Sequence, residues 1–220
     1  MEKINRWGIY MLGMLMLAVG ISLTTKTGLG VSPIIAVAFC VSEVFGLNFG
    51  DMTFLLYTIF VVAQLFLRDR REHIAVLLQL VVSLVFSRVL NFLGAVITYD
   101  HALHTLPVNL IVLAFAIFFT GAGVSLSVNM RLIPNPGDGI VQAVAQKREW
   151  PQGFAKNLFD SGCVAVAALI GFFCSRKIIG IGLGTLLSML GVGRAVALVN
   201  RFFRKKMLVC AGLESFSDKP

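Results

Sequence analysis

The sequence predicts an all-α polytopic membrane protein. Six transmembrane helices form an inverted 3+3 repeat, and two short segments form half-helices or re-entrant helices. Three observations predict this fold: the composition, the lengths of the apolar segments, and the similarity of the two halves. Of the 220 residues, 57% are hydrophobic and only 14% are charged, and the mean hydropathy is +0.87. Soluble domains carry about 25% charged residues, so soluble, disordered and disulfide-rich secreted proteins are excluded.

The sequence has six apolar segments, separated by charged or glycine-rich linkers. Their lengths approach the roughly 20 residues that a membrane helix needs. The second is slightly short unless Phe49 and Gly50 join it. The predicted spans run from about Trp7 to Leu23, Met52 to Leu67, Ile74 to Val96, Leu106 to Val128, Asn157 to Phe173 and Ile178 to Val199. The chain is then a single membrane domain, residues 1–220, with a basic cytoplasmic tail at 201–220.

Two further apolar segments are too short to cross the membrane. Pro33–Val44 and Pro136–Ala145 give helices of roughly 15–18 Å, whereas the hydrocarbon core is about 30 Å thick. Each begins at a proline, which is favoured at the first helical position, and each follows irregular sequence, GLGVS or RLIPN. They predict half-helices that enter from opposite faces and meet near the midplane.

The basic residues predict the orientation, because Lys and Arg accumulate in cytoplasmic loops. The linker TYDHALHTLP has no Lys or Arg and lies outside if both termini are cytoplasmic, and only Lys26 and Arg176–Lys177 break the rule. The basic clusters that then lie inside are Arg68–Arg71, Arg131 with Lys147 and Arg148, and Arg201 with Arg204, Lys205 and Lys206. This placement accounts for the net charge of +8 without nucleic acid as a partner.

The two halves of the chain are similar at an offset of 103 residues. The segment GISL at 20–23 matches GVSL at 123–126, Pro33 matches Pro136, and the offset later drifts to 106, where Arg88 matches Arg194. Repeat 1 covers about 7–98 and repeat 2 about 106–206. Each repeat has three crossings, and an odd number gives the two repeats opposite orientations, as in inverted-repeat transporters.

Several motifs carry a resemblance to a known family. GISL followed by GLGVSP, a short helix and a Gly-Asp turn, together with IGIGLGTLLSMLGVG late in the chain, resemble the YczE/YyaS/YitT family of bacterial integral membrane proteins. The resemblance covers most of the chain. It implies a multi-pass protein of the bacterial cell (inner) membrane, described in that family as a membrane protein or permease, without a defined substrate.

The half-helix ends are the first candidate binding site. Broken backbone in lipid is tolerated only where protein buries it or a wet cavity adjoins it. Ser32 and Asn135 are placed as N-caps, and the helix ends favour an anionic or hydrogen-bond-accepting ligand. Capping without any ligand explains the same pattern. The predicted substrate-binding residues here are Ser32, Pro33, Asn135, Pro136, Gly137 and Asp138.

Charged residues within the predicted spans supply further candidates. An arginine at a helix centre costs about 2.5–3.5 kcal/mol, so Arg88 and Arg194 need a partner or water. They either face an anionic substrate from two pseudo-symmetric sides, or form structural pairs or extend to the interface. Asp160 is the candidate partner of either arginine. Asp160 and Asp138 are also candidates for a coupling proton, although Asp138 equally complements a positive helix end.

The third predicted span carries a polar stripe with a spacing of four residues. Gln79, Ser83, Ser87 and Asn91 follow one helix face. Such a stripe faces the bundle interior, where it lines a pathway or only bonds neighbouring helices. Gln79 and Asn91 are therefore assigned as coupling or partner residues.

The sequence has no enzymatic or metal-binding signature. GxSxG, HExxH, P-loop and CxxC motifs are absent. We therefore expect no enzyme activity, no cofactor and no metal site.

The pattern as a whole favours a secondary transporter, or permease, for a small and plausibly anionic solute, in which one repeat rocks against the other. A passive channel and a non-transporting scaffold or accessory subunit are the alternatives. The expected partners are a small-molecule or ion substrate and the lipid bilayer. The sequence leaves a homo-oligomer open.

Overall fold

The computed structural model describes residues 2–213, and within that range every regular element is helical. The elements in chain order are α1 (Glu2–Lys26), α2 (Pro33–Phe45), α3 (Phe49–Leu67), η1 (Arg70–Glu72), α4 (His73–Val96), η2 (His101–Leu103), α5 (Leu106–Asn129), α6 (Pro136–Arg148), α7 (Gln152–Ser175) and α8 (Leu183–Cys210). Six of these helices are long and apolar enough to cross a membrane. The predicted all-α fold with six spans is therefore confirmed.

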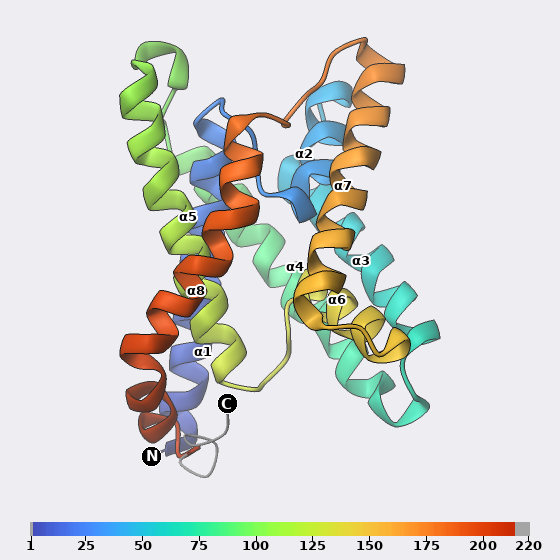
Figure 1. Ribbon diagram of the computed structural model, residues 1–220, viewed down its shortest axis with the longest axis vertical. Coiled ribbons are helices and arrows are strands. Elements are labelled where there is room, and N and C mark those ends of the chain that lie inside the picture. Colours follow the sequence, from blue (N-terminus) through green and yellow to red (C-terminus); the bar gives the residue numbers. More distant parts are fainter. Residues whose placement is uncertain (1, 214–220) are drawn as a thin grey trace.

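Two helices are half-length. α2 and α6 have 13 residues each, about 20 Å at 1.5 Å per residue, and begin at Pro33 and Pro136. Figure 1 places α2 in the half of the molecule far from the start of α1 and α6 in the half near it. In each case the preceding loop turns back into the molecule before the helix begins.

Several boundaries differ from the prediction: α7 begins at Gln152 rather than Asn157, and both ends of the last helix move. The last helix begins at Leu183, not near Ile178, because Gly180 has a φ of +74° and interrupts the helix. The same helix continues to Cys210, so the first part of the predicted basic tail, 201–210, is helical. Residues 214–220 of that tail lie outside the described residues.

The helices form two groups joined by one helix (Figure 1). The first bundle consists of α1, α5 and α8, and the second bundle of α2, α3, α6 and α7. Within the second bundle, α2 packs on α7 and α3, and α6 packs on α3 and α7. α4 packs against both α1 and α3 and so links the bundles.

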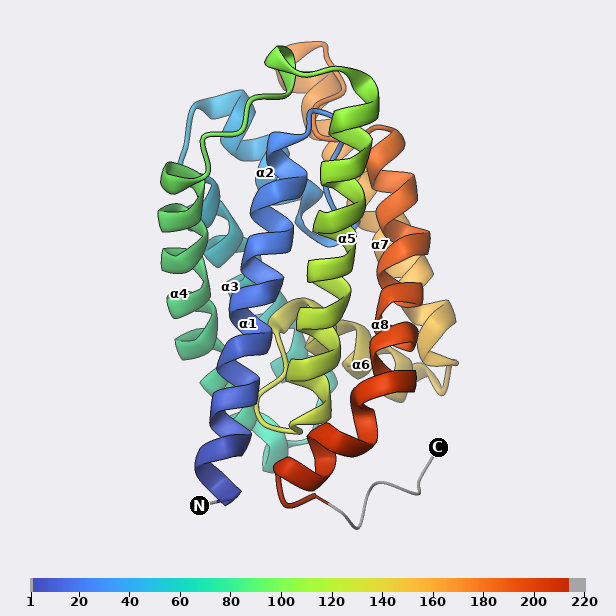
Figure 2. The same cartoon turned by 90° about the vertical axis from the view of Figure 1, so that its left-hand side faces the viewer.

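Glycines allow close packing in the first bundle. Figure 2 shows α1 and α5 side by side along most of their length. A Cβ at Gly20 would collide with Thr120, and one at Gly123 would collide with the backbone of Leu17. Such small residues let membrane helices approach closely enough for backbone packing.

Candidate solute site

The two half-helices begin with the same backbone geometry. The N-cap residue Ser32 has φ −59° and ψ 137°, and Asn135 has φ −58° and ψ 138°. The Asn135 Oδ1 accepts a hydrogen bond of 2.9 Å from the Gly137 N–H, which confirms the predicted cap. Ser32 also occupies the predicted N-cap position, but its side chain makes no capping hydrogen bond.

A cavity of about 50 Å³ lies where the two N-termini meet. We call it the central cavity. The second bundle and its caps contribute the polar residues Ser32, Tyr57, Asn135, Asp138 and Lys156, together with Ile34, Ile35 and Gly137. The first bundle contributes Leu17, Ile21, Thr120, Val124 and Val192. The polar groups of the cavity therefore come almost entirely from the second bundle.

Asn135 has an unused donor in this cavity. Its side chain is only 6% exposed. Its amide lies beside the Tyr57 hydroxyl group, but Nδ2 makes no hydrogen bond of normal geometry within the described residues. Because Oδ1 is held by Gly137, the amide cannot turn to exchange its two atoms without losing the cap. A buried donor without a partner is costly unless a ligand or water accepts from it.

Lys156 is the site residue that sequence reasoning missed. It lines the central cavity, and its Nζ lies 3.4 Å from Asp160 Oδ2. Asp160 is buried, and its Oδ1 has no hydrogen-bond partner among the described residues. The predicted pairing of Asp160 with Arg88 or Arg194 is therefore wrong. The i, i+4 spacing of Lys156 and Asp160 on one helix was the signal that pointed to the true partner.

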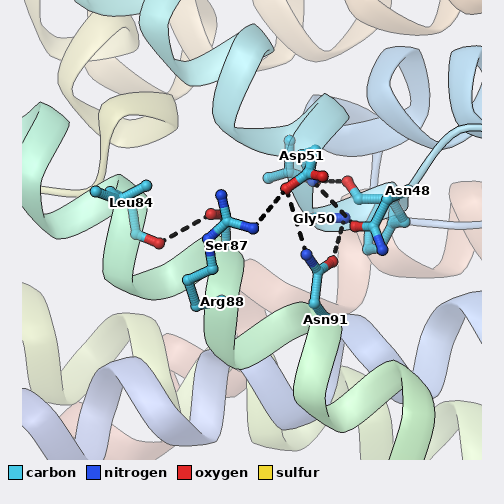
Figure 3. Close-up of polar contacts among 9 residues, drawn as sticks. Asn48, Gly50, Asp51, Leu84, Ser87, Arg88 and Asn91 are labelled. Carbon is cyan, nitrogen blue, oxygen red and sulfur yellow. Dashed lines mark hydrogen bonds and ion pairs between the residues drawn. The ribbon is translucent and has the colours of Figure 1, made fainter.

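Arg88 does not reach the central cavity. Figure 3 shows its side chain beside Asp51, at the start of α3, with an Nη1–Oδ1 distance of 3.0 Å. Asn91 reaches the same region: its Nδ2 is 3.4 Å from Asp51 Oδ1, and its Oδ1 accepts from the Gly50 N–H at 2.9 Å. Arg88 and Asn91 thus fasten α4 to the first turn of α3, and neither lines the cavity.

The other two candidates also lie outside the central cavity. Arg194 is exposed on α8 and does not line it. Gln79 is buried and pairs with Gln64, whose Nε2 lies 3.4 Å from the Pro136 carbonyl oxygen. Gln79 therefore supports the start of α6 indirectly, through its hydrogen bonds with Gln64. Of the predicted residues, Ser32, Asn135, Gly137 and Asp138 line the cavity itself.

A second cavity of about 250 Å³, lined by polar and apolar side chains, adjoins the first and shares Asp138 and Lys156 with it. We call it the vestibule. Its other polar residues are Ser125, Asn129, Gln142, Gln152 and Asn200, where Ser125 Oγ and Asn129 Nδ2 donate to Asn200 Oδ1 at 2.7 and 2.6 Å. The end of α5 and the start of α7 contribute to it, and both lie at the end of the molecule where α1 begins (Figure 1).

The opposite side of the central cavity is covered by two loops. The Val31 N–H donates to the Gly180 carbonyl at 2.9 Å, and the Gly184 N–H donates to the Leu29 carbonyl at 2.7 Å. Gly30 reaches this arrangement with a φ of +112°, which other residues rarely adopt. We call this contact the loop seal. A cavity of about 150 Å³ beyond it shares no lining residue with the central cavity.

The chain is similar to proteins whose function is not known. Residues 4–201, which include the central cavity and the vestibule, match a family of unknown function (DUF6198). The Uncharacterized membrane protein YczE of Bacillus subtilis (strain 168) is 28% identical over 157 residues, 71% of this chain and 70% of that protein. No solved structure matches the chain.

Proposed function

Since the chain belongs to the family of unknown function DUF6198, and its motif resemblance to the YczE family is confirmed by the Bacillus relative, we propose that it is a secondary transporter for a small solute. That relative is named only as an uncharacterized membrane protein, so the proposal depends on the site. The protein is a membrane protein with six candidate spans, and the central cavity is the proposed substrate site.

One observation carries the proposal: the N-termini of two half-helices meet at a cavity that holds a buried amide donor, beside Tyr57, and that adjoins a vestibule lined in part by polar side chains. Interrupted helices in lipid need such a polar environment for their backbone groups. Transporters place substrates at half-helix ends near the midplane. A scaffold that only joins helices has no use for a polar route into its centre.

We infer an inverted repeat from the packing. The pairing of α1 with α4 corresponds to that of α5 with α8, and the pairing of α2 with α7 corresponds to that of α3 with α6. The near-identical backbone angles at Ser32 and Asn135 support the same correspondence. The two repeats are interwoven, so the conformational change differs from a rocking of one repeat against the other.

Alternating access, in this proposal, is a movement of the second bundle against the first. The extensive contact of α1 with α5 and the contacts of α2 with α7 and of α3 with α6 tie the two repeats together. The central cavity lies between the bundles, and its polar groups travel with the second bundle. The vestibule is then the open side and the loop seal the closed side.

The proposed location is the bacterial cell membrane with the vestibule facing the cytoplasm. α1 begins and α8 ends at the same end of the molecule, which also carries η1 with Arg70 and Arg71 (Figure 1). The clustering of basic residues at that end supports a cytoplasmic assignment, because positive charge accumulates inside.

The test is transport by the purified chain in proteoliposomes. Uptake of nitrate, formate, acetate, urea and methylammonium is measured with and without an imposed ion gradient, against protein-free liposomes. A transporter accumulates at least one probe uphill, and a channel only equilibrates it. Absence of protein-dependent flux for all five probes contradicts the proposal and favours the scaffold.

A further inference from the structure

We infer that the solute is a small monovalent oxyanion, of nitrate or carboxylate size, that binds beside Lys156 and moves together with one proton carried by Asp138. This inference rests on the proposed function and names its substrate class and coupling. Asn135 Nδ2, the two helix N-termini and the Lys156 ammonium group would bind the oxygen atoms. Arg88 and Arg194, the cationic residues that the sequence suggested for the substrate site, do not line the central cavity.

Size limits the solute. The central cavity measures about 50 Å³. One water needs about 10–15 Å³ of such space, so the cavity holds a solute of roughly three to five non-hydrogen atoms. Formate, nitrate and acetate fit this space, whereas sugars, amino acids with side chains and nucleotides would extend from it into the vestibule.

The hydrogen-bond donors of the cavity determine the sign of the ligand's charge. Asn135 Nδ2 is a buried donor that makes no hydrogen bond of normal geometry within the described residues. The first free N–H of α6, at Gly137, is already bonded to Asn135 Oδ1, whereas α2 has no side-chain cap; each helix N-terminus carries about half a positive charge. The unbonded donors require an acceptor. An oxyanion satisfies several of them at once, whereas ammonium, which has no acceptor, satisfies none.

The charges predict the coupled proton. Lys156 is paired with Asp160, so these two groups cancel. Asp138 forms no ion pair within 4.0 Å in the described part of the chain, and its one negative charge balances the two half-charges of the helix ends. When a solute anion binds, its negative charge would neutralise the helix ends in place of the charge of Asp138. Asp138 must then gain a proton, because a second uncompensated negative charge in this site is costly.

Asp160 is the other carboxyl group near Asp138, but its ion pair with Lys156 favours its charged form, so we assign the proton to Asp138. Tyr57 on α3, with Lys156 and Asp160 on α7, supplies its titratable neighbours. The lining residues from α1, α2, α5 and α8 carry no charged side chain. The step is a simple protonation: a proton from the aqueous phase adds to an Asp138 oxygen as the anion binds, and both leave on the other side. One proton moves with each anion, and no net charge crosses.

The experiment uses the full chain in proteoliposomes with nitrate, formate and acetate, and an internal pH-sensitive dye. Nitrate is the key probe because its acid is too strong to cross lipid in neutral form. An inward proton gradient of one pH unit should drive about tenfold accumulation of the anion at equilibrium. One proton enters with each anion, so the tenfold proton gradient supports an equal and opposite anion gradient. Uptake should acidify the lumen and should not change when a membrane potential is imposed.

Variants assign the roles. Asp138→Asn, which is permanently neutral, should still equilibrate the anion but lose the tenfold accumulation. Asp138→Glu, which can still take up a proton, should keep it. Lys156→Gln should reduce the initial uptake rate at least tenfold, and Lys156→Arg should restore part of it. Two exposed matched controls, Asp69→Asn and Lys147→Gln, should behave as the wild type.

The outcomes separate this inference from the proposed function. Anion uptake that follows membrane potential and ignores the pH gradient overturns the inference, and the transporter proposal stands. Protein-dependent movement of urea or methylammonium, but of no anion, has the same consequence. Accumulation by Asp138→Asn equal to the wild type also overturns it. If none of the probes moves, the inference and the proposed function both fail.

Discussion

Gln64 and Gln79 exchange two amide hydrogen bonds, each 3.0 Å long, between α3 and α4. Both side chains are at most 1% exposed, and Gln64 Nε2 also lies 3.4 Å from the Pro136 carbonyl oxygen. The pair therefore satisfies two amides in the apolar part of the protein and holds the first residue of α6 in place. It links the helix that joins the bundles to the half-helix that carries the site.

The first prediction tests this pair with a double-mutant cycle. Gln64→Leu and Gln79→Leu each leave one buried amide without its partner, at a cost of about 1–3 kcal/mol. The double variant removes both amides and should be less destabilised than the sum of the two single variants. Chemical unfolding in detergent micelles measures the three differences. Strict additivity would show that the amides do not interact.

The second prediction concerns the contact of α1 with α5. Gly20→Ala places a Cβ against Thr120, and Gly123→Ala places one against the backbone of Leu17, so the helices must separate. Overpacking of this kind costs about 1–3 kcal/mol. Gly8→Ala is the matched control on α1, because a Cβ there meets nothing within 4 Å. Equal thermal midpoints for all three variants would contradict close packing at this contact.

Much of the architecture could be predicted because it depends on local rules. The lengths of the apolar segments determine which helices cross, and prolines mark the starts of α2 and α6. The Asn135 cap followed from its position before Pro136. The last helix began later than predicted, because apolar residues around Gly180 continue the hydropathy run although the backbone there has left the helix.

The charged residues could not be assigned in the same way. Arg88 lies within an apolar run, and its partner Asp51 is 37 residues away on another helix, so only the fold brings the two together. Lys156 stands one residue before the predicted span, whereas α7 begins at Gln152 and places it in the cavity. Hydropathy locates spans, but it does not identify the face that a flanking charge occupies.

The third prediction follows from the corrected place of Arg88. Its ion pair with Asp51 is exposed, with 61% and 45% of the two side chains accessible. Arg88→Gln removes this ion pair but does not change the lining of the central cavity, so transport rates should stay as in the wild type. A tenfold loss of uptake in this variant, with normal folding by size-exclusion chromatography, would show that Arg88 takes part in transport.

The fourth prediction concerns the loop seal. A Cβ at Gly182 would lie 2.5 Å from the Leu29 carbonyl oxygen, a backbone atom that a side-chain movement cannot relieve. Gly182→Ala should therefore separate the two loops and expose position 32 from the side opposite the vestibule. Gly94→Ala on α4, where a Cβ meets nothing within 4 Å and which lines neither the central cavity nor the vestibule, is the control.

Labelling of Ser32→Cys with a membrane-impermeant thiol reagent measures this exposure. The exposed Cys174 and Cys210 are first replaced by serine, whereas Cys40 and Cys163 are buried and are retained. With the native loops, labelling should occur from the vestibule side only, and Gly182→Ala should add labelling from the other side. Labelling from both sides in the chain with native loops would show that the seal does not close the cavity.

The last prediction separates the two atoms of the Asn135 amide. Oδ1 caps α6 by accepting from the Gly137 N–H, whereas Nδ2 is the buried donor beside Tyr57 in the central cavity. Asn135→Asp keeps an oxygen for the cap and replaces the donor by a second carboxylate oxygen near Asp138. It should therefore keep the start of α6 but lose some stability. Because a carboxylate repels an anion where the amide would donate to it, the KM for a transported anion should rise at least tenfold.

Asn135→Leu, in contrast, removes both atoms and should lose about 0.5–2 kcal/mol of stability along with transport, which is the usual cost of a lost cap. Ser32→Ala serves as the comparison at the other helix, where no side-chain cap bond exists, and should change stability by much less. Thermal unfolding and anion uptake are measured on the same preparations. An Asn135→Asp variant with wild-type KM would show that Nδ2 does not contact the solute, because the cap alone would then account for this residue.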